Sequence, residues 1–264
     1  MNITSSKIQR LVSVHPDAII GENVIIDPFT VIHKNVKIGE GTWIGSNVTI
    51  MDGARIGKNC KIFPGAVISA IPQDLKFVGE DSFVHIGDHS VIRECVTINR
   101  GTAALGITKI GVHCLIMAYC HIAHDCSVGD YSIFSNNSTL AGHVEVGKNV
   151  ILSGFTAVNQ FCNIGDYVFV SGGSMVRKDI PPFIKVGREP VSFVGINSVG
   201  LSRHGFDTSQ LREIQDIYRI IFQKKYNITQ ALDVLNREIR ESLEKKKIID
   251  FLNKSNRGII KGYF

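Results

Sequence analysis

The sequence has no long apolar run without charges. Its longest uncharged stretch, residues 149–165, is broken by Ser, Asn, Gln, Thr and Gly, whereas a membrane-spanning helix needs about 20 consecutive apolar residues. The N-terminal segment contains Lys7 and Arg10 but lacks the apolar core of about 7 to 15 residues and the small-residue cleavage site of a secretory signal. We therefore expect a cytoplasmic protein without an integral membrane segment.

An excess of charge is also missing from most of the chain. Residues 1–190 contain 16 basic and 16 acidic side chains, whereas residues 191–264 contain 13 and 8, so the tail holds the whole net charge of +5. Such a tail is either a solvated helical face or a binding surface for an acidic partner. It lacks aromatic residues interleaved with Arg, which argues against nucleic acid. An acidic protein or a phosphorylated ligand is the better candidate.

An aliphatic residue recurs at every sixth position. The series runs without a gap from Ile20 to Ile68, resumes at Ile86, and continues to Val176 with few exceptions. Two positions before each large residue stands a small or β-branched one, and Gly often follows it. A period of six fits neither a helix nor hairpin-linked strands. Three such units would form one triangular coil of 18 residues, and about eight coils stacked at about 4.8 Å would give a prism of roughly 38 Å.

The repeat fails in two places without losing its frame. These excursions, residues 69–85 and 99–109, should form loops outside the prism, where binding groups tend to lie. The repeat ends after Pro181 and Pro182, and a helical pattern follows. We expect a mainly β fold: a parallel β-helix of hexapeptide repeats over residues 1–190, then a C-terminal α-helical domain over residues 191–264. Proteins with this pattern have a left-handed coil.

The cysteines do not form a CxxC pair. Five of the six occupy the small inward position of the repeat: Cys60, Cys114, Cys120, Cys126 and Cys162. Reduced packing residues are therefore expected, with no structural zinc and no disulfide.

Polar residues that are far apart in sequence should share one face of the prism, a coil apart. The repeating coil places the following there: His121, His124, Asp125, Gly142, His143 and Gln160. A solvated polar face is the plainer interpretation. A carboxylate, several imidazoles and a glycine backbone in adjacent columns also match an active site.

The chemistry of this group suits proton abstraction from a hydroxyl. His124 is a candidate general base, Asp125 would fix its tautomer, and the Gly142 N–H could meet a developing oxyanion. Because the sequence places no Ser or Cys nucleophile beside this base, direct attack by an acceptor hydroxyl is preferred over an acyl-enzyme.

Several motifs resemble those of the UDP-N-acetylglucosamine O-acyltransferase family across essentially the whole chain. They are QDLKF (73–77), INRGT (98–102), HIAHDC (121–126), LAGHV (140–144), IPPF (180–183), GLSRHGF (200–206) and SNRGII (255–260). The resemblance implies transfer of an (R)-3-hydroxyacyl group from acyl carrier protein to the 3-hydroxyl of UDP-N-acetylglucosamine, the first step of lipid A biosynthesis. It also implies a homotrimer with active sites between neighbouring prisms, and no metal or cofactor beyond the phosphopantetheine of the carrier protein.

The resemblance also implies residue roles. His124 corresponds to the general base, Asp125 to its partner and Gly142 to the oxyanion donor. The substrate-binding positions are Gln73, Asp74, Lys76, His121, His143 and Gln160, with Asn197 and Arg203 near the nucleotide. Gly172 matches the acyl-chain ruler, and a glycine there implies a longer acyl chain. Asn159, Val199, Ser202 and His204 depart from the family pattern, which bears on nucleotide contacts more than on the reaction.

Other functions are compatible with the same pattern. The protein could acylate a 3-amino sugar or act as the N-acyltransferase of the same pathway. His121, His124 and His143 could instead hold zinc, as in γ-class carbonic anhydrases. A non-catalytic solenoid scaffold is a further alternative.

Overall fold

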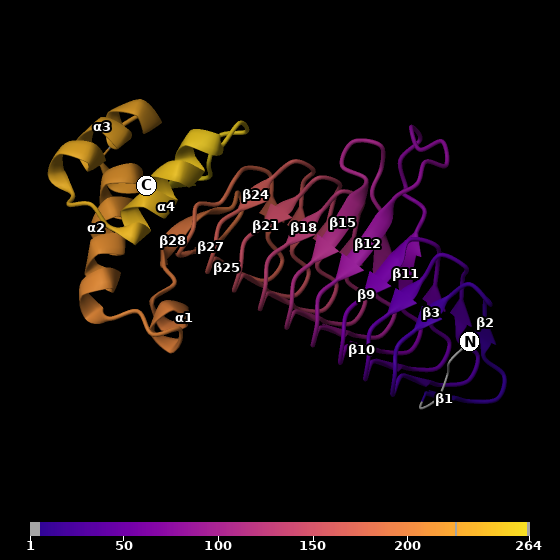
Figure 1. Cartoon of the computed structure of the whole chain (residues 1–264). Helices are drawn as coiled ribbons and strands as arrows, with labels where there is room; N and C mark the ends of the chain where they lie inside the picture. The colour runs from indigo at the N-terminus through magenta and orange to yellow at the C-terminus, as the bar shows by residue number, and fades with distance from the viewer. Residues whose placement is uncertain (1–5, 225, 263–264) are drawn as a thin grey trace.

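The computed structural model describes residues 6–224 and 226–262. Figure 1 shows short strands stacked coil upon coil into a three-sided prism, with the N-terminus at one end and the helices grouped at the other. The fold is a left-handed β-helix with a C-terminal helical part, as expected from the six-residue repeat. None of the helices in the described chain is long and apolar enough to cross a membrane.

Three sheets form the sides of the prism, and almost all of their strand pairs are parallel. Sheet A contains β1 (Lys7–Ile8), β4 (Ile25–Ile26), β7 (Trp43–Ile44), β10 (Lys61–Ile62), β13 (Val91–Ile92), β16 (Leu115–Ile116), β19 (Ile133–Phe134), β22 (Ile151–Leu152), β25 (Phe169–Val170), β27 (Ile184–Gly187), β28 (Ser192–Ile196) and β29 (Lys261–Gly262). Sheet B contains β2 (Ser13–Val14), β5 (Val31–Ile32), β8 (Thr49–Ile50), β11 (Val67–Ala70), β14 (Thr97–Asn99), β17 (His121–Ile122), β20 (Thr139–Leu140), β23 (Ala157–Val158) and β26 (Met175–Val176). Sheet C contains β3 (Ile19–Ile20), β6 (Lys37–Ile38), β9 (Ala54–Ile56), β12 (Phe83–Ile86), β15 (Ile107–Ile110), β18 (Ser127–Val128), β21 (Glu145–Val146) and β24 (Asn163–Ile164).

The strands of successive coils pair in the register that the repeat predicts. Lys7 pairs with Ile25, three repeat units farther along the chain. The sequence separation between paired residues grows to five units across the first loop, where Lys61 pairs with Val91. It is four units across the second loop, where Val91 pairs with Leu115. The first loop thus inserts two whole units and the second inserts one, so the later aliphatic residues of the series still point into the core.

The irregular parts of the two excursions are shorter than the sequence suggests. They span residues 71–82 and 100–106, because β11, β12 and β15 each continue to four residues beside them. Figure 1 shows both loops projecting from the prism near β12 and β15. Both therefore leave the same corner, between sheets B and C.

Left-handed backbone conformations mark the corners of the prism. Bulky residues adopt them as well as Asn and Gly, as at Tyr119 (φ 62°), Asp125 (φ 58°) and His143 (φ 60°). This conformation costs energy for residues with a Cβ, yet it recurs at equivalent positions of successive coils, as at Asp125 and His143. The corners consequently hold side chains in stacked columns.

Within the described residues, four helices follow the β-helix: α1 (Ser198–Arg203), α2 (Thr208–Gln223), α3 (Ile228–Glu238) and α4 (Leu243–Lys254). Asp207 and Asn227 cap α2 and α3 in capping boxes with Gln210 and Gln230. The Tyr218 hydroxyl donates a 2.5 Å hydrogen bond to the Pro182 carbonyl, which ties α2 to the last coil. The expected domain division after residue 190 falls between β27 and β28, two antiparallel neighbours in one sheet, and stays a prediction.

Candidate active site

His124 and Asp125 form a hydrogen-bonded pair at the corner between β17 and β18. His124 Nδ1 lies 2.8 Å from Asp125 Oδ2. The Asp125 side chain is fully buried, whereas the His124 side chain keeps 13% of its surface exposed. The pair therefore has a sheltered carboxylate behind an imidazole that solvent or a substrate can reach.

The second loop holds the Asp125 carboxylate in place. Thr102 donates to it twice, through its hydroxyl at 2.6 Å and its backbone N–H at 3.0 Å. The Leu105 N–H adds a bond at 3.3 Å, and the Asp125 N–H donates to Thr108 Oγ1 at 2.9 Å. Burial by itself would raise the pKa of Asp125, but the hydrogen bonds from Thr102 and His124 outweigh it and lower that pKa below its usual value. Asp125 is thus ionised at neutral pH.

An ionised Asp125 determines the tautomer of His124. A carboxylate can only accept a hydrogen bond, so Nδ1 of His124 must carry the proton that it shares with Asp125. Nε2 then holds the free lone pair. This is the arrangement of a general base oriented by a carboxylate.

Gly142 lies against the His124 ring. A Cβ added at Gly142 would stand 2.6 Å from His124 Cε1 and 2.7 Å from Nε2, so no other residue fits while the ring stays in place. Within the described residues, the Gly142 N–H has no hydrogen-bond acceptor. A free donor beside the basic nitrogen is what an oxyanion site requires.

The other histidines of this corner are close to the pair. His143 Nε2 is 3.8 Å from Asp125 Oδ2, and its ring stacks on Phe161 with centroids 4.6 Å apart. His121 Nδ1 is 2.7 Å from Thr97 Oγ1. Burial, and secondarily the nearby His124, lower the pKa of His121. His121 is therefore neutral at pH 7 and can donate or accept a hydrogen bond.

Three residues of the corner could hold a metal ion by distance. They are His124, Asp125 and His143, whose ligand atoms lie within 4.8 Å of one another. This set differs from the three histidines of the zinc alternative, because Asp125 replaces His121. In addition, Nδ1 of His124 is already bonded to the carboxylate.

Gln73, Asp74 and Lys76 lie on the first loop, which leaves the same corner. The Asp74 carboxylate accepts the Lys76 N–H at 3.0 Å, so the two residues belong to one tight turn. Farther along the loop, Glu80 accepts the Ala103 N–H at 2.8 Å. The first loop is thereby joined to the second, which in turn holds Asp125.

The remaining predicted site residues are spread over the chain. Gln160 is exposed on the coil after Gly142, in the same corner column. Asn197 and Arg203 line a cavity of about 250 Å³ with Lys185 and Phe169. Asn197 also has a structural role, since its side chain caps α1 and donates to the Tyr167 carbonyl at 2.9 Å.

Gly172 does not join the catalytic corner within one chain. It lies at the corner between β25 and β26, where sheets A and B meet, and it is exposed. The pair His124 and Asp125 lies at the other edge of sheet B.

Sequence reasoning did not identify Thr102, Thr108 or Glu80. Thr102 belongs to the INRGT motif, but its contact with Asp125 depends on how the second loop folds back. Thr108 could have been found, because it occupies the same position of the repeat as Cys126, one coil below the catalytic turn.

Comparisons with known proteins give a consistent result. The model for domain 2 of UDP-N-acetylglucosamine O-acyltransferase matches residues 179–260, and the bacterial transferase hexapeptide model matches residues 35–70 and 107–142. The acyl-[acyl-carrier-protein]–UDP-N-acetylglucosamine O-acyltransferase of Chlorobaculum tepidum is 50% identical over 186 residues, 70% of each chain. The Thiobacillus denitrificans protein of the same name is 41% identical over 191 residues, 72% of this chain and 74% of that protein. This chain belongs to the UDP-N-acetylglucosamine O-acyltransferase family.

Solved structures of the family agree over nearly the full length. The UDP-N-acetylglucosamine acyltransferase of Bacteroides fragilis has a TM-score of 0.94 at 47% identity and covers 96% of this chain and 99% of its own. The Francisella novicida enzyme also has a TM-score of 0.94, at 40% identity, covering 96% of this chain and 94% of its own. The agreement includes the helical part as well as the prism.

Proposed function

We propose that this protein transfers an (R)-3-hydroxyacyl group from acyl carrier protein to the 3-hydroxyl of UDP-N-acetylglucosamine, the first step of lipid A biosynthesis. The observation that carries the proposal is the His124–Asp125 pair with Gly142 against its ring, in a chain 50% identical to an enzyme of that name. A free imidazole nitrogen beside an unused N–H suits acyl transfer to a hydroxyl.

The reaction would proceed by direct attack. His124 Nε2 takes the proton of the sugar hydroxyl as its oxygen bonds to the thioester carbon, and Asp125 stabilises the imidazolium that forms. The Gly142 N–H donates to the oxyanion of the tetrahedral intermediate. Collapse of the intermediate expels the thiol of the carrier protein, and the imidazolium returns the proton to its sulfur. No metal or separate cofactor takes part in this sequence.

The substrate would bind with its sugar near the histidines. We assign His121, His143 and Gln160 to the sugar, and Gln73, Asp74 and Lys76 to a loop that closes over it. Asn197 and Arg203 would contact the nucleotide, and Gly172 would leave room for a long acyl chain. Because Gly172 and His124 lie on opposite edges of sheet B, we assign them to a site shared by neighbouring chains.

A homotrimer supplies that arrangement. Sheet A presents an apolar outward column that suits contact with further copies of the chain. It consists of Val91, Leu115, Ile133, Ile151 and Phe169, which pair in register and are half-buried within one chain. We place the trimer in the cytoplasm, where the carrier protein is found.

One assay separates this function from its alternatives. The purified protein is given (R)-3-hydroxyacyl carrier protein with UDP-N-acetylglucosamine or its 3-amino analogue, and the product is identified by mass spectrometry. An ester of the first sugar is expected. An amide of the second sugar alone would change the acceptor, and no product together with stoichiometric bound zinc would favour the zinc enzyme.

A further inference from the structure

Basic side chains form a column on the outer face of sheet C. Lys37 pairs with Arg55, Arg55 with His85, and His85 with Lys109, each in register on consecutive strands β6, β9, β12 and β15. We call these four residues the basic column. It borders a shallow groove of about 500 Å³, whose floor includes Ile56, Ile86 and Ile110.

The charges of the basic column have no carboxylate partners in the part of the chain that the structure describes. Among residues 6–224 and 226–262, no carboxylate lies within 4.0 Å of Lys37, Arg55 or Lys109. Arg55 is held in place by hydrogen bonds to the Asn35 carbonyl and side chain and by the Phe83 ring, 4.8 Å from its guanidinium carbon. Like charges opposite each other on paired strands destabilise a sheet. An external anion would relieve that repulsion.

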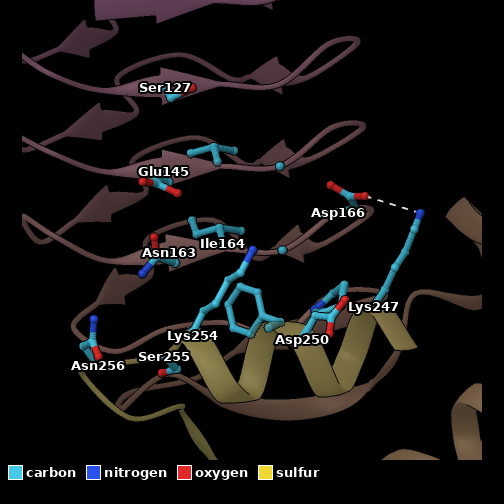
Figure 2. Close-up of a pocket in the computed structure, with 15 residues that line it drawn as sticks. Ser127, Glu145, Asn163, Ile164, Asp166, Lys247, Asp250, Lys254, Ser255 and Asn256 are labelled. Atoms are coloured by element: carbon cyan, nitrogen blue, oxygen red, sulfur yellow. Dashed lines mark ion pairs between the residues drawn. The ribbon is translucent and has the colours of Figure 1, made fainter. Parts of the chain in front are cut away.

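The basic column ends where the helical part begins to cover the sheet. The same outward positions continue as Ser127, Glu145 and Asn163. Figure 2 shows these three side chains stacked on the face toward α4, where Lys247 pairs with Asp166 at 3.6 Å. The cationic residues are therefore confined to the part of sheet C that α4 leaves uncovered.

We propose that the basic column is the docking surface for the acidic face of the acyl carrier protein. This inference rests on the proposed function for the identity of the partner. Lys109 is next to Thr108, whose hydroxyl accepts the Asp125 N–H, so the column begins beside the catalytic corner. A carrier protein docked there would hold its flexible arm close to His124.

The spacing of the column suits an acidic helix. Strands about 4.8 Å apart place four side chains over about 14 Å. Carboxylates on one face of a helix recur about every 5.4 Å, once per turn. Acidic side chains at this spacing can thus meet Lys37, Arg55 and Lys109. His85 lies between the last two and offers a hydrogen bond, because burial, Arg55 and Lys109 lower its pKa and favour the neutral imidazole. Unpaired charges at such a surface speed association and select the partner.

The basic tail is a weaker candidate for the same role. Several of its cations already have carboxylate partners within 4.0 Å: Arg219, Arg237, Arg240, Lys245 and Lys247. Four of the partners belong to the tail itself, so its net charge of +5 is unchanged, but these cations are already engaged and are less free to meet another protein. The neutral total of residues 1–190 conceals a surface whose cations are not engaged in this way.

Charge reversal tests the proposal in the full-length enzyme. Lys37→Glu and Lys109→Glu are made singly and together, with Lys246→Glu on the exposed side of α4 as the matched control. We expect the double variant to raise KM for acyl carrier protein about tenfold at low salt. Its kcat and its KM for UDP-N-acetylglucosamine should stay within about twofold, and the effect should shrink at high salt because exposed charges are screened.

Three results would overturn the proposal. The first is an unchanged KM for the carrier protein in the double variant, and the second is an equal rise of that KM in the Lys246→Glu control. The third is that the double variant loses binding to vesicles containing anionic lipid while its KM for the carrier protein stays the same. If the wild-type enzyme transfers no acyl group, the proposed function fails instead. Direct binding of the carrier protein to the wild-type and double-variant chains, measured by fluorescence anisotropy, then still decides whether the basic column is its docking surface.

Discussion

His124 lies so close to Gly142 that the two positions cannot both carry side chains. A Cβ at position 142 would come within 2.7 Å of the imidazole Nε2, the nitrogen that the Asp125 hydrogen bond leaves free. The base and the adjacent N–H are thus parts of one geometry, set by the stacking of one coil on the next.

Gly142→Ala should therefore impair catalysis more than folding. The added methyl group displaces the His124 ring, and a misplacement of about 1 Å at a reacting group can cost about 100-fold in rate. We expect kcat to fall by about that factor while the oligomeric state and Tm change little. Gly154→Ala is the control, because its added Cβ meets nothing closer than 3.4 Å. Unchanged kcat in Gly142→Ala would contradict the contact.

Thr102→Val should weaken the His124–Asp125 pair by removing a hydrogen bond to the Asp125 carboxylate. The change removes the 2.6 Å hydroxyl bond to Asp125 but keeps the backbone N–H bond, so the pKa of Asp125 should rise. The pKa of Asp125 is lower in the folded protein than in the unfolded chain, where it is about 4, so the ionised carboxylate stabilises the fold at higher pH. This stabilisation is lost as the pH falls through the pKa of the folded state. We expect kcat to drop about tenfold, because hydrogen bonds to charged groups contribute about 1.5–3 kcal/mol. We also expect the stability of the folded protein at neutral pH to decrease.

Thr102→Ser retains the hydroxyl and serves as the control for that experiment. It should recover most of kcat and of the neutral-pH stability in chemical denaturation. If Val and Ser behave alike, Thr102 acts through packing and does not position Asp125.

Gly172→Met should shift donor preference toward shorter acyl chains. Gly172 is exposed at its corner, and an added Cβ would lie 3.2 Å from the Gly154 carbonyl oxygen and 3.8 Å from Ser153 Cβ. A longer side chain would project into the space proposed for the end of the acyl chain. Competition between donors of different length measures the shift, and an unchanged profile would refute the ruler role.

The cysteines should differ sharply in reactivity. Burial raises the pKa of Cys114, Cys120 and Cys162 to about 11 and that of Cys126 to about 12. Cys95 is exposed, and the thiolate is the reactive form. A thiol reagent at about pH 7.5 should label one cysteine rapidly in the native protein and all six in denaturant. Rapid labelling of several native cysteines would contradict the packed core.

Most of the prism follows from the repeat alone. The aliphatic series predicts which side chains are buried, and insertions of whole repeat units explain why two loops leave the register intact. The same arithmetic brings His124 over Gly142. It could not reveal Thr102 on Asp125, because an irregular loop has no period from which its fold could be read. Nor did it show the left-handed backbone at Asp125 and His143, which is set by the corner and not by residue preference.

The basic column, by contrast, could have been found from the sequence but was missed. Its members occupy one outward position of the repeat, so the register alone could have brought Lys37, Arg55, His85 and Lys109 together. Counting charge by segment hid them, since acidic residues elsewhere in residues 1–190 balance the total. That no described carboxylate pairs with Lys37, Arg55 or Lys109 could be seen only from the positions of the side chains.

The general base is the central claim, and His124→Ala tests it most directly. Acyl transfer from (R)-3-hydroxyacyl carrier protein to UDP-N-acetylglucosamine is measured for wild type and variant, with oligomeric state and thermal unfolding as checks on structure. General-base catalysis contributes about 10²–10⁴ in rate, so we predict a loss of kcat in that range with assembly and Tm unchanged. A folded His124→Ala enzyme with near-wild-type kcat would contradict the account.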